Sequence, residues 1–204
     1  MKLLVDTDAF CKLAVAGVLE DAVRLLGAEL SDCGRLPALP HMLRRGRLRK
    51  KYGTEACDYL LPLAESLRPI LETPGVWLDR LTAIEAIDPG EAQLFDVAAE
   101  HDMVVLTGDK RALLVAKDVA GFPTALAGRI VVLEAILLAL CDSIGVNELR
   151  RRVQPLLALD LVASICFSGA VSDPRVGLQS YFESVAAGVA PLVLWAPPPS
   201  KGEK

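Results

Sequence analysis

The chain has 204 residues, a formal net charge of −4 and 52% hydrophobic residues. This length suits one domain with an elaboration, and the apolar content is enough for a sizeable buried core. The net negative charge excludes attraction of nucleic acid or an anionic membrane by the whole surface, so a polyanion would need a local basic patch.

The five cysteines include no Cys-x-x-Cys pair, and the chain has only two histidines. This pattern predicts reduced thiols in a cytoplasmic protein and argues against a Cys/His zinc site. Asp6 and Asp8 interrupt the N-terminal apolar run, so no signal peptide is expected. The most apolar internal segment, residues 130–140, is too short to cross a bilayer, so no membrane association is expected.

The first half of the chain begins with an apolar run at residues 2–5, which predicts a short buried strand. The spacing of apolar residues over 8–26 predicts one amphipathic helix. Glycines and prolines between residues 27 and 40 indicate loop or extended chain, and residues 54–72 are expected to be helical with Pro62 limiting the helix.

The best-defined unit runs from residue 88 to 107, where a capped helix is followed by a turn and a buried strand. A further helix is expected from Asp109 or Lys110, then a strand at 129–133 that leads into a helix ending near Ile144. Strands that alternate with helices are typical of an α/β fold with a parallel sheet.

Beyond Gly145 the sequence predicts helices and loops only, over about 146–159 and 174–189. We therefore expect residues 136–196 to form a helical C-terminal extension. Residues 197–204 are polar and rich in proline, which predicts a disordered tail.

Three acidic residues occupy comparable places in this pattern. Asp6 follows the first strand, Asp109 follows the strand that ends at Thr107, and Glu91 opens the helix between them. Because ligands of a parallel sheet gather outside the carboxyl ends of its strands, the three carboxylates are expected to converge. Clustered carboxylates repel one another unless a cation lies among them, and hard oxygen ligands favour Mg²⁺ or Mn²⁺.

Each acid also has an ordinary structural interpretation. Asp88 and Glu91 fit a capping box, and Asp109 fits the N-cap of the next helix. The two interpretations are compatible, because a carboxylate in a first helical turn can cap the helix and still face a metal. A purely structural interpretation, in which the three acids only cap helices and form no metal site, remains a separate possibility.

A basic segment lies between the first two predicted helices. It consists of Arg44, Arg45, Arg47, Arg49, Lys50 and Lys51. Such a run is commonly a solvated helix face. Beside an acidic site it would serve instead as a track for backbone phosphates, for which arginine is well suited.

Three motifs together resemble the PIN-domain family. They are Leu4-Val-Asp-Thr-Asp-Ala-Phe10, Gly90-Glu-Ala-Gln93 and Leu106-Thr-Gly-Asp-Lys-Arg111. The resemblance covers residues 1–135 and implies a three-layer α/β/α domain with a short parallel sheet. Members are ribonucleases that depend on Mg²⁺ or Mn²⁺, among them the toxins of bacterial toxin–antitoxin pairs.

The resemblance implies a metal-dependent ribonuclease that leaves a 5′-phosphate and a 3′-hydroxyl. Asp6, Glu91 and Asp109 match the acids that would hold the metal, and Asp8 and Thr107 match supporting polar groups. RNA is the expected partner. A cognate antitoxin or another protein partner, and a homodimer, are further expectations of the resemblance.

The chain departs from the family pattern at one place. The family usually carries a further acid that opens a middle helix, and here the sequence reads His41-Met-Leu-Arg-Arg45. This departure leaves open a module of the same fold that binds RNA or protein without cleaving. A third hypothesis is a phosphatase of the haloacid dehalogenase type, because Asp6-Thr-Asp8 resembles the paired aspartates of that family.

Overall fold

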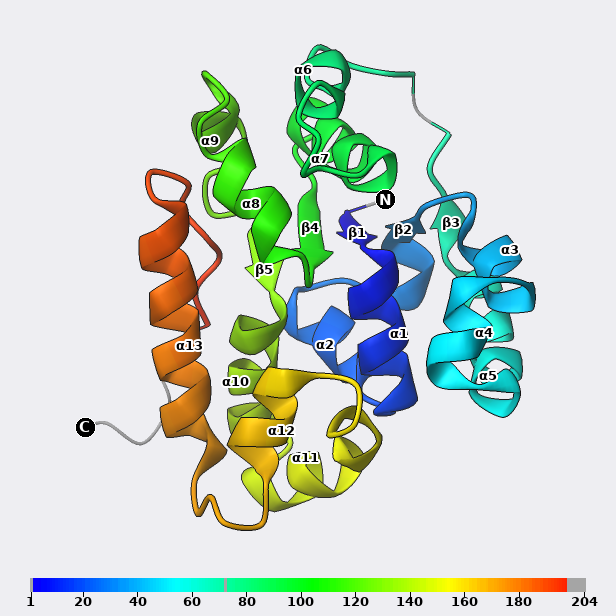
Figure 1. The fold of residues 1–204 in the computed structure, drawn as a ribbon, viewed down its shortest axis with the longest axis vertical. Coiled ribbons are helices and arrows are strands. Elements are labelled where there is room, and N and C mark those ends of the chain that lie inside the picture. Colours follow the sequence, from blue (N-terminus) through cyan, green and yellow to red (C-terminus); the bar gives the residue numbers. More distant parts are fainter. Residues whose placement is uncertain (1, 72, 198–204) are drawn as a thin grey trace.

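The computed structural model describes residues 2–71 and 73–197. A parallel sheet forms the centre of the molecule (Figure 1). Within these residues the strands lie in the order β3-β2-β1-β4-β5. They are β1 (Leu3–Val5), β2 (Cys33–Arg35), β3 (Arg68–Pro69), β4 (Val104–Thr107) and β5 (Ile130–Val132). Every neighbouring pair is parallel, which confirms the predicted α/β class. Of the tail expected at 197–204, residues 198–204 lie outside the described residues.

Helices connect the strands and follow the last one. The first half of the chain contains α1 (Thr7–Val15), α2 (Leu19–Leu25), α3 (Leu39–Arg44), α4 (Arg47–Tyr52), α5 (Thr54–Ser66), α6 (Leu78–Thr82) and α7 (Pro89–Glu100). The second half contains α8 (Lys110–Ala116), α9 (Phe122–Ala125), α10 (Leu133–Ser143), α11 (Val146–Arg152), α12 (Leu161–Phe167) and α13 (Pro174–Val189).

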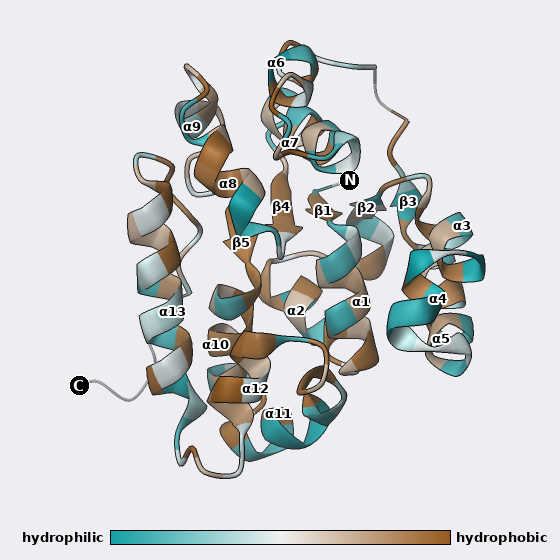
Figure 2. Ribbon diagram, viewed as in Figure 1, coloured by the Kyte–Doolittle hydropathy of each residue, from teal (hydrophilic) through white to brown (hydrophobic). Residues whose placement is uncertain are grey.

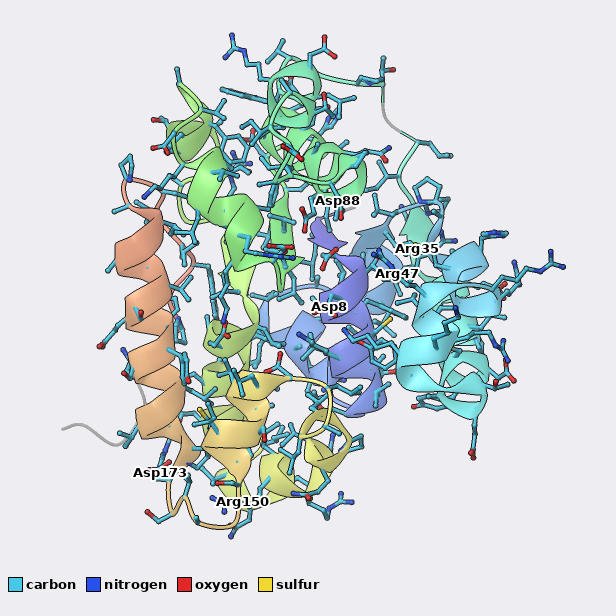
Figure 3. The ribbon with its side chains drawn as sticks, in the orientation of Figure 1. Asp8, Arg35, Arg47, Asp88, Arg150 and Asp173 are labelled. Atoms are coloured by element: carbon cyan, nitrogen blue, oxygen red, sulfur yellow. The ribbon has the colours of Figure 1, made fainter. Side chains whose placement is uncertain are left out.

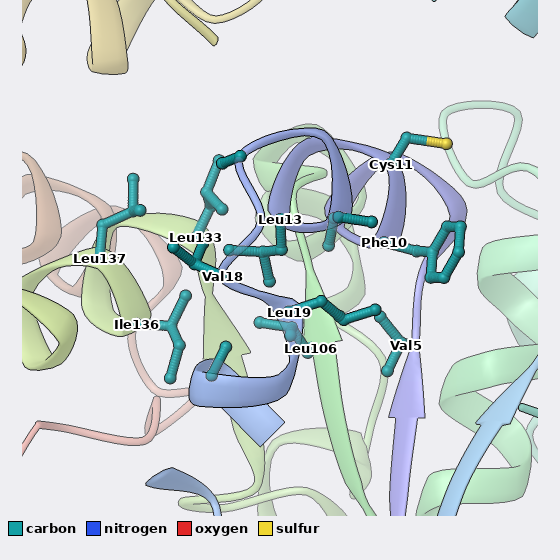
Figure 4. Packing of buried hydrophobic residues seen from close by; sticks show 14 of the residues in the cluster. Val5, Phe10, Cys11, Leu13, Val18, Leu19, Leu106, Leu133, Ile136 and Leu137 are labelled. Atoms are coloured by element: carbon teal, nitrogen blue, oxygen red, sulfur yellow. The ribbon is translucent and has the colours of Figure 1, made fainter. Parts of the chain in front are cut away.

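Two hydrophobic cores lie on opposite faces of the sheet. Because successive strand residues point to opposite faces, Leu3 and Val5 enter one core and Leu4 enters the other. Helices α1, α2, α5 and α10 cover the first face, where Leu13, Leu106 and other apolar side chains interdigitate (Figure 4). Helices α7, α8 and α9 cover the second face. Strands β1 and β5 and the first three residues of β4 are accordingly apolar, whereas the border strand β3 is hydrophilic (Figure 2).

Three predicted elements differ from the structure at breaks in the helical pattern. The helix expected over 8–26 is two helices, because Gly17 adopts a left-handed conformation with φ of 63° between them. The helix expected over 54–72 ends at Ser66, and the chain then forms the edge strand β3. The helix expected over 146–159 ends at Arg152, and Pro155 lies in a short 3₁₀ turn instead.

The C-terminal helices share a core with the rest of the chain. Helix α10 passes without a break through residue 135, and the first core joins residues from α1 to α12. Near the end of the described chain, Leu194 forms a parallel bridge with Ile130, and the Trp195 amide donates to the Ile130 carbonyl at 2.8 Å. No helix in the described ranges combines the length and apolarity needed to cross a bilayer.

Candidate functional site

A cleft of about 970 Å³ opens at the carboxyl edge of the sheet. Its lining comes from the β1–α1 junction, the β2–α3 loop, helix α4, the start of α7 and the β4–α8 turn. The predicted acids Asp6, Glu91 and Asp109 all line it, together with Asp8 and Asp88. Residues up to about 100 positions apart in sequence therefore meet in one place because the strands are parallel and adjacent.

Asp6 is placed by the end of β1. It is the N-cap of α1, and its Oδ2 accepts hydrogen bonds from the amides of Asp8 at 3.1 Å and Ala9 at 3.4 Å. Only 7% of Asp6 is exposed. Burial and, to a lesser extent, the negative charge of Asp8 together raise the pKa of this carboxyl to about 6.

Glu91 and Asp109 face each other across the cleft floor. Glu91 belongs to a complete capping box, in which its Oε2 accepts from the Asp88 amide at 3.1 Å. Asp109 caps α8, and its Oδ1 accepts from the amides of Arg111 and Ala112. Burial and, to a lesser extent, a hydrogen bond with the Asp109 carboxylate together raise the pKa of Glu91 to about 8.

The predicted caps are therefore confirmed, and they coexist with a shared cleft. The capping bonds use a single carboxylate oxygen in each case, namely Oδ2 of Asp6, Oε2 of Glu91 and Oδ1 of Asp109. Each helix start thus holds its acid in place without occupying the whole carboxylate. Burial is the main cause of the raised pKa values of Asp6 and Glu91, and neighbouring carboxylates contribute to both shifts.

Asp8 differs from these acids because lysines neutralise it. Its Oδ2 lies 2.6 Å from Lys12 Nζ, and its Oδ1 lies 2.7 Å from Lys51 Nζ. The Tyr52 hydroxyl also donates to Oδ1, at 3.5 Å. Although burial acts to raise it, the pKa of Asp8 is lowered on balance by the two lysines.

Thr107 lies beneath the cleft and does not line it. It is 1% exposed, and its Oγ1 accepts a hydrogen bond from the Asp109 amide at 3.1 Å. This bond shapes the turn between β4 and α8. Thr107 therefore supports the position of Asp109 from below.

The six residues of the basic segment divide into three pairs. Arg47 and Lys51 on α4 line the cleft, and Figure 3 shows Arg47 near Asp8. Arg44 pairs with Glu65, and Arg49 pairs with Asp58, both on α5. Arg45 and Lys50 are exposed. The predicted phosphate track is thus concentrated on two of its six residues in this geometry.

The wall formed by the β2–α3 loop carries no carboxylate. Leu36 and Ala38 of this loop line the cleft, as does Met42 of α3, which belongs to the His41–Arg45 stretch where the resemblance implies a further acid. Behind this wall the buried Arg35 guanidinium donates to the carbonyls of Ala64, Leu36 and Pro37. Arg35 thereby fixes the loop, and the cleft gains an apolar side instead of a fourth acid.

The donor chemistry of the cleft fits a hard divalent cation. Asp6, Glu91 and Asp109 provide carboxylate oxygens, and a bound cation would favour the charged forms of Asp6 and Glu91, which burial and neighbouring carboxylates disfavour. As the side chains are placed, no three His, Cys, Asp or Glu groups within residues 2–71 and 73–197 stand at metal-holding spacing. Binding would therefore require the free carboxylate oxygens to turn toward a common point.

Sequence reasoning missed two cations of the cleft, Lys110 and Arg111. They directly follow Asp109 in sequence, so the strand-end rule that placed the aspartate could have placed them too. It also missed Lys12, whose spacing of four residues from Asp8 is the helical signal for an ion pair.

Comparisons with protein-family models, with curated proteins and with solved structures found no significant match for this chain.

Proposed function

We propose that the protein is a Mg²⁺- or Mn²⁺-dependent ribonuclease of the PIN type. The observation that supports the proposal is the convergence of Asp6, Glu91 and Asp109 on one cleft at the carboxyl edge of a parallel sheet. These are the residues that the sequence resemblance matches to metal-holding acids. A divalent cation would favour the charged forms of Asp6 and Glu91, whose pKa values are raised mainly by burial, and this provides a physical reason for a cation to bind there.

In this proposal Asp6, Glu91 and Asp109 hold the metal through the oxygens that their capping bonds leave available. When bound, the metal supplies an activated water and stabilises charge on the phosphate. Thr107 keeps the Asp109 turn in place, and Asp88 fixes Glu91 through the capping box.

The cations of the cleft would bind and orient the RNA. Arg47 and Lys51 project from α4, and Lys110 and Arg111 from the start of α8, so positive groups lie on two different elements of the cleft. Backbone phosphates on either side of the acids would each find a basic partner. This arrangement would hold a single strand across the carboxylates.

The test is Mn²⁺ calorimetry combined with cleavage of single-stranded RNA by wild type, Asp6→Asn and Asp109→Asn. Asparagine is as good an N-cap as aspartate, so both variants keep their helix starts and lose only the charged ligand. Asp173→Asn is the matched control, because Asp173 caps α13 far from the cleft (Figure 3). We expect both site variants to lose Mn²⁺ binding and cleavage and the control to keep both.

Absence of divalent-ion binding by the wild type at millimolar concentration would contradict the proposal. Retention of full cleavage by Asp6→Asn would contradict it equally, because the reaction would then not depend on this carboxylate.

A second candidate function is a binding module that does not cleave. It is favoured by the β2–α3 wall, where Leu36, Ala38 and Met42 stand in place of an acid, and by Lys51, whose ammonium already lies in the cleft. This candidate expects RNA binding that needs no divalent ion and that Asp6→Asn leaves unchanged. The same set of variants therefore separates the two functions.

A further inference from the structure

Two lysines that belong to cleft-forming elements are bound by carboxylates of the C-terminal helices. Lys12 on α1 has its Nζ 2.6 Å from Asp160 Oδ2, and Lys110 on α8 pairs with Glu134 of α10. The side chains of Lys12 and Asp160 are 10% and 11% exposed, and that of Glu134 is 2% exposed. Both ion pairs are thus largely shielded from solvent and connect the cleft to residues beyond 133.

Asp160 uses its two oxygens for two different tasks. Oδ1 accepts from the Ala163 amide at 2.9 Å and so caps α12, while Oδ2 accepts from Lys12 Nζ at 2.6 Å. The position of Asp160 is therefore fixed by a helix start. The Lys12 ammonium is held in place in turn, because it is paired with Asp160.

Lys12 transmits the position to Asp8. The same ammonium that contacts Asp160 lies 2.6 Å from Asp8 Oδ2. This oxygen is close to the β4–α8 turn as well, because a Cβ added at Gly108 would lie only 3.1 Å from it. Asp8 is therefore held against the turn that carries Asp109, within the cleft.

The charge of Lys12 matters as much as its position. The Lys12 ammonium lies beside Asp8, two residues from Asp6, and its positive charge would oppose a divalent cation in the cleft unless it were balanced. Asp8 is shared with Lys51, so Asp160 supplies the carboxylate that balances the charge of Lys12. Together the two aspartates and two lysines carry no net charge, so Lys12 adds no uncompensated positive charge beside the cleft.

We propose that the C-terminal helices are a working part of the candidate site, with Asp160 acting through Lys12 as the positioning residue for Asp8. The consequence for metal affinity rests on the proposed function, whereas the positioning of Asp8 does not. Residues beyond 135 would then be required for the site itself as well as for folding.

The experiment compares wild type, Asp160→Asn and Asp160→Glu, with Asp173→Asn as the control. Asparagine keeps the cap of α12 and removes the charge that binds Lys12, and the control makes the same change at the cap of α13. The first readout is the side-chain ¹³Cγ resonance of Asp8 in metal-free protein. The second is the Mn²⁺ dissociation constant from calorimetry.

We expect the Asp8 resonance to shift in Asp160→Asn and not in Asp173→Asn, with Mn²⁺ affinity reduced about tenfold in the first variant only. Asp160→Glu restores the charge and should recover part of the loss. An Asp8 resonance that is identical in wild type and Asp160→Asn would overturn the proposal. If the wild type binds no Mn²⁺, the proposed function fails, and the Asp8 resonance still decides the positioning role.

Discussion

Two groups of buried carboxylates lie close together in this molecule and have opposite electrostatic surroundings. In the cleft, burial raises the pKa of Asp6 to about 6 and that of Glu91 to about 8. Beside them, burial acts in the same direction on Asp8 and Asp160, yet the bonds to Lys12, and for Asp8 also to Lys51, lower the pKa of both on balance. The difference is the presence of an internal cation.

This comparison separates two uses of a buried acid. Asp160 is neutralised within the fold and ties elements together, as expected for a structural ion pair. Asp6 and Glu91 are left without such a cation, which costs stability and is typical of functional sites. The acids whose charged forms are disfavoured by the fold thus lie at the place where the sequence resemblance implies a metal.

The largest effect is expected from removal of Lys12, the cation that distinguishes the paired acids from the unpaired ones. Lys12→Met leaves Asp160, whose side chain is 11% exposed, without its cation, whereas the side chain of Asp8 is 37% exposed and keeps Lys51, so the free energy of unfolding should fall by about 3 kcal/mol, the lower end of the cost of breaking a buried pair. Urea denaturation measures this loss. Lys2→Met is the control, because Lys2 pairs with Asp32 at 3.8 Å in an exposed position, and its loss should be below about 1 kcal/mol. Equal losses of unfolding free energy in the two variants would show that the buried ion pairs of Lys12 contribute no more than an exposed pair.

Removal of the carboxyl of Glu91 would test the other side of the comparison, the buried acid that has no internal cation. The folded pKa of about 8 lies above the ordinary value of 4.5, so the folded state holds this proton more tightly than the unfolded state. The stability of metal-free wild type should therefore fall as pH rises from about 4.5 to about 8, by at most about 1.4 kcal/mol per pH unit. Glu91→Gln keeps the capping box and should lack this component of the slope.

Denaturation at pH 4, 6 and 8.5 in the presence of a chelator measures the effect. Glu55→Gln is the matched control, because Glu55 also stands in a first helical turn but is exposed. We expect Glu91→Gln to gain stability relative to wild type at pH 8.5 and not at pH 4. A gain of the same size at both pH values would contradict the assigned cause.

The smallest expected effect concerns the basic segment. Arg47 lines the cleft, whereas Arg44 pairs with Glu65. For single-stranded RNA, Arg47→Gln should reduce the log–log salt dependence of binding by about 0.7, the value for one phosphate, and Arg44→Gln should leave it unchanged. Fluorescence anisotropy across a salt titration measures both. Identical slopes for the two variants would remove the distinction between the cleft-lining and outer arginines.

The fold could be predicted from sequence wherever apolar runs were bounded by clear turn signals. The strands after which Asp6 and Asp109 stand, and the helix that Glu91 opens, follow from buried runs and caps. β3 could not be predicted, because Arg68 and Pro69 carry no strand pattern and are extended only by pairing with β2. The split between α1 and α2 depended on the conformation of Gly17, which the apolar periodicity across it concealed.

The candidate site could be predicted as far as strand ends define it. Asp6, Glu91 and Asp109 follow from parallel topology, and so in principle do Lys110 and Arg111. The role of Asp160 could not be predicted, because its partner Lys12 is 148 positions away and no local pattern links them. Such a contact is decided by packing of the C-terminal helices and is visible only in three dimensions.

The two borders of the sheet are both unsuited to extension. At one border β3 offers only two residues, one of them a proline that has no amide hydrogen to donate. At the other, the chain near Leu194 and Trp195 already takes up hydrogen-bonding capacity of β5. Edge-to-edge aggregation and recognition by strand addition are therefore both disfavoured. A protein partner of this molecule would have to recognise helices or the cleft.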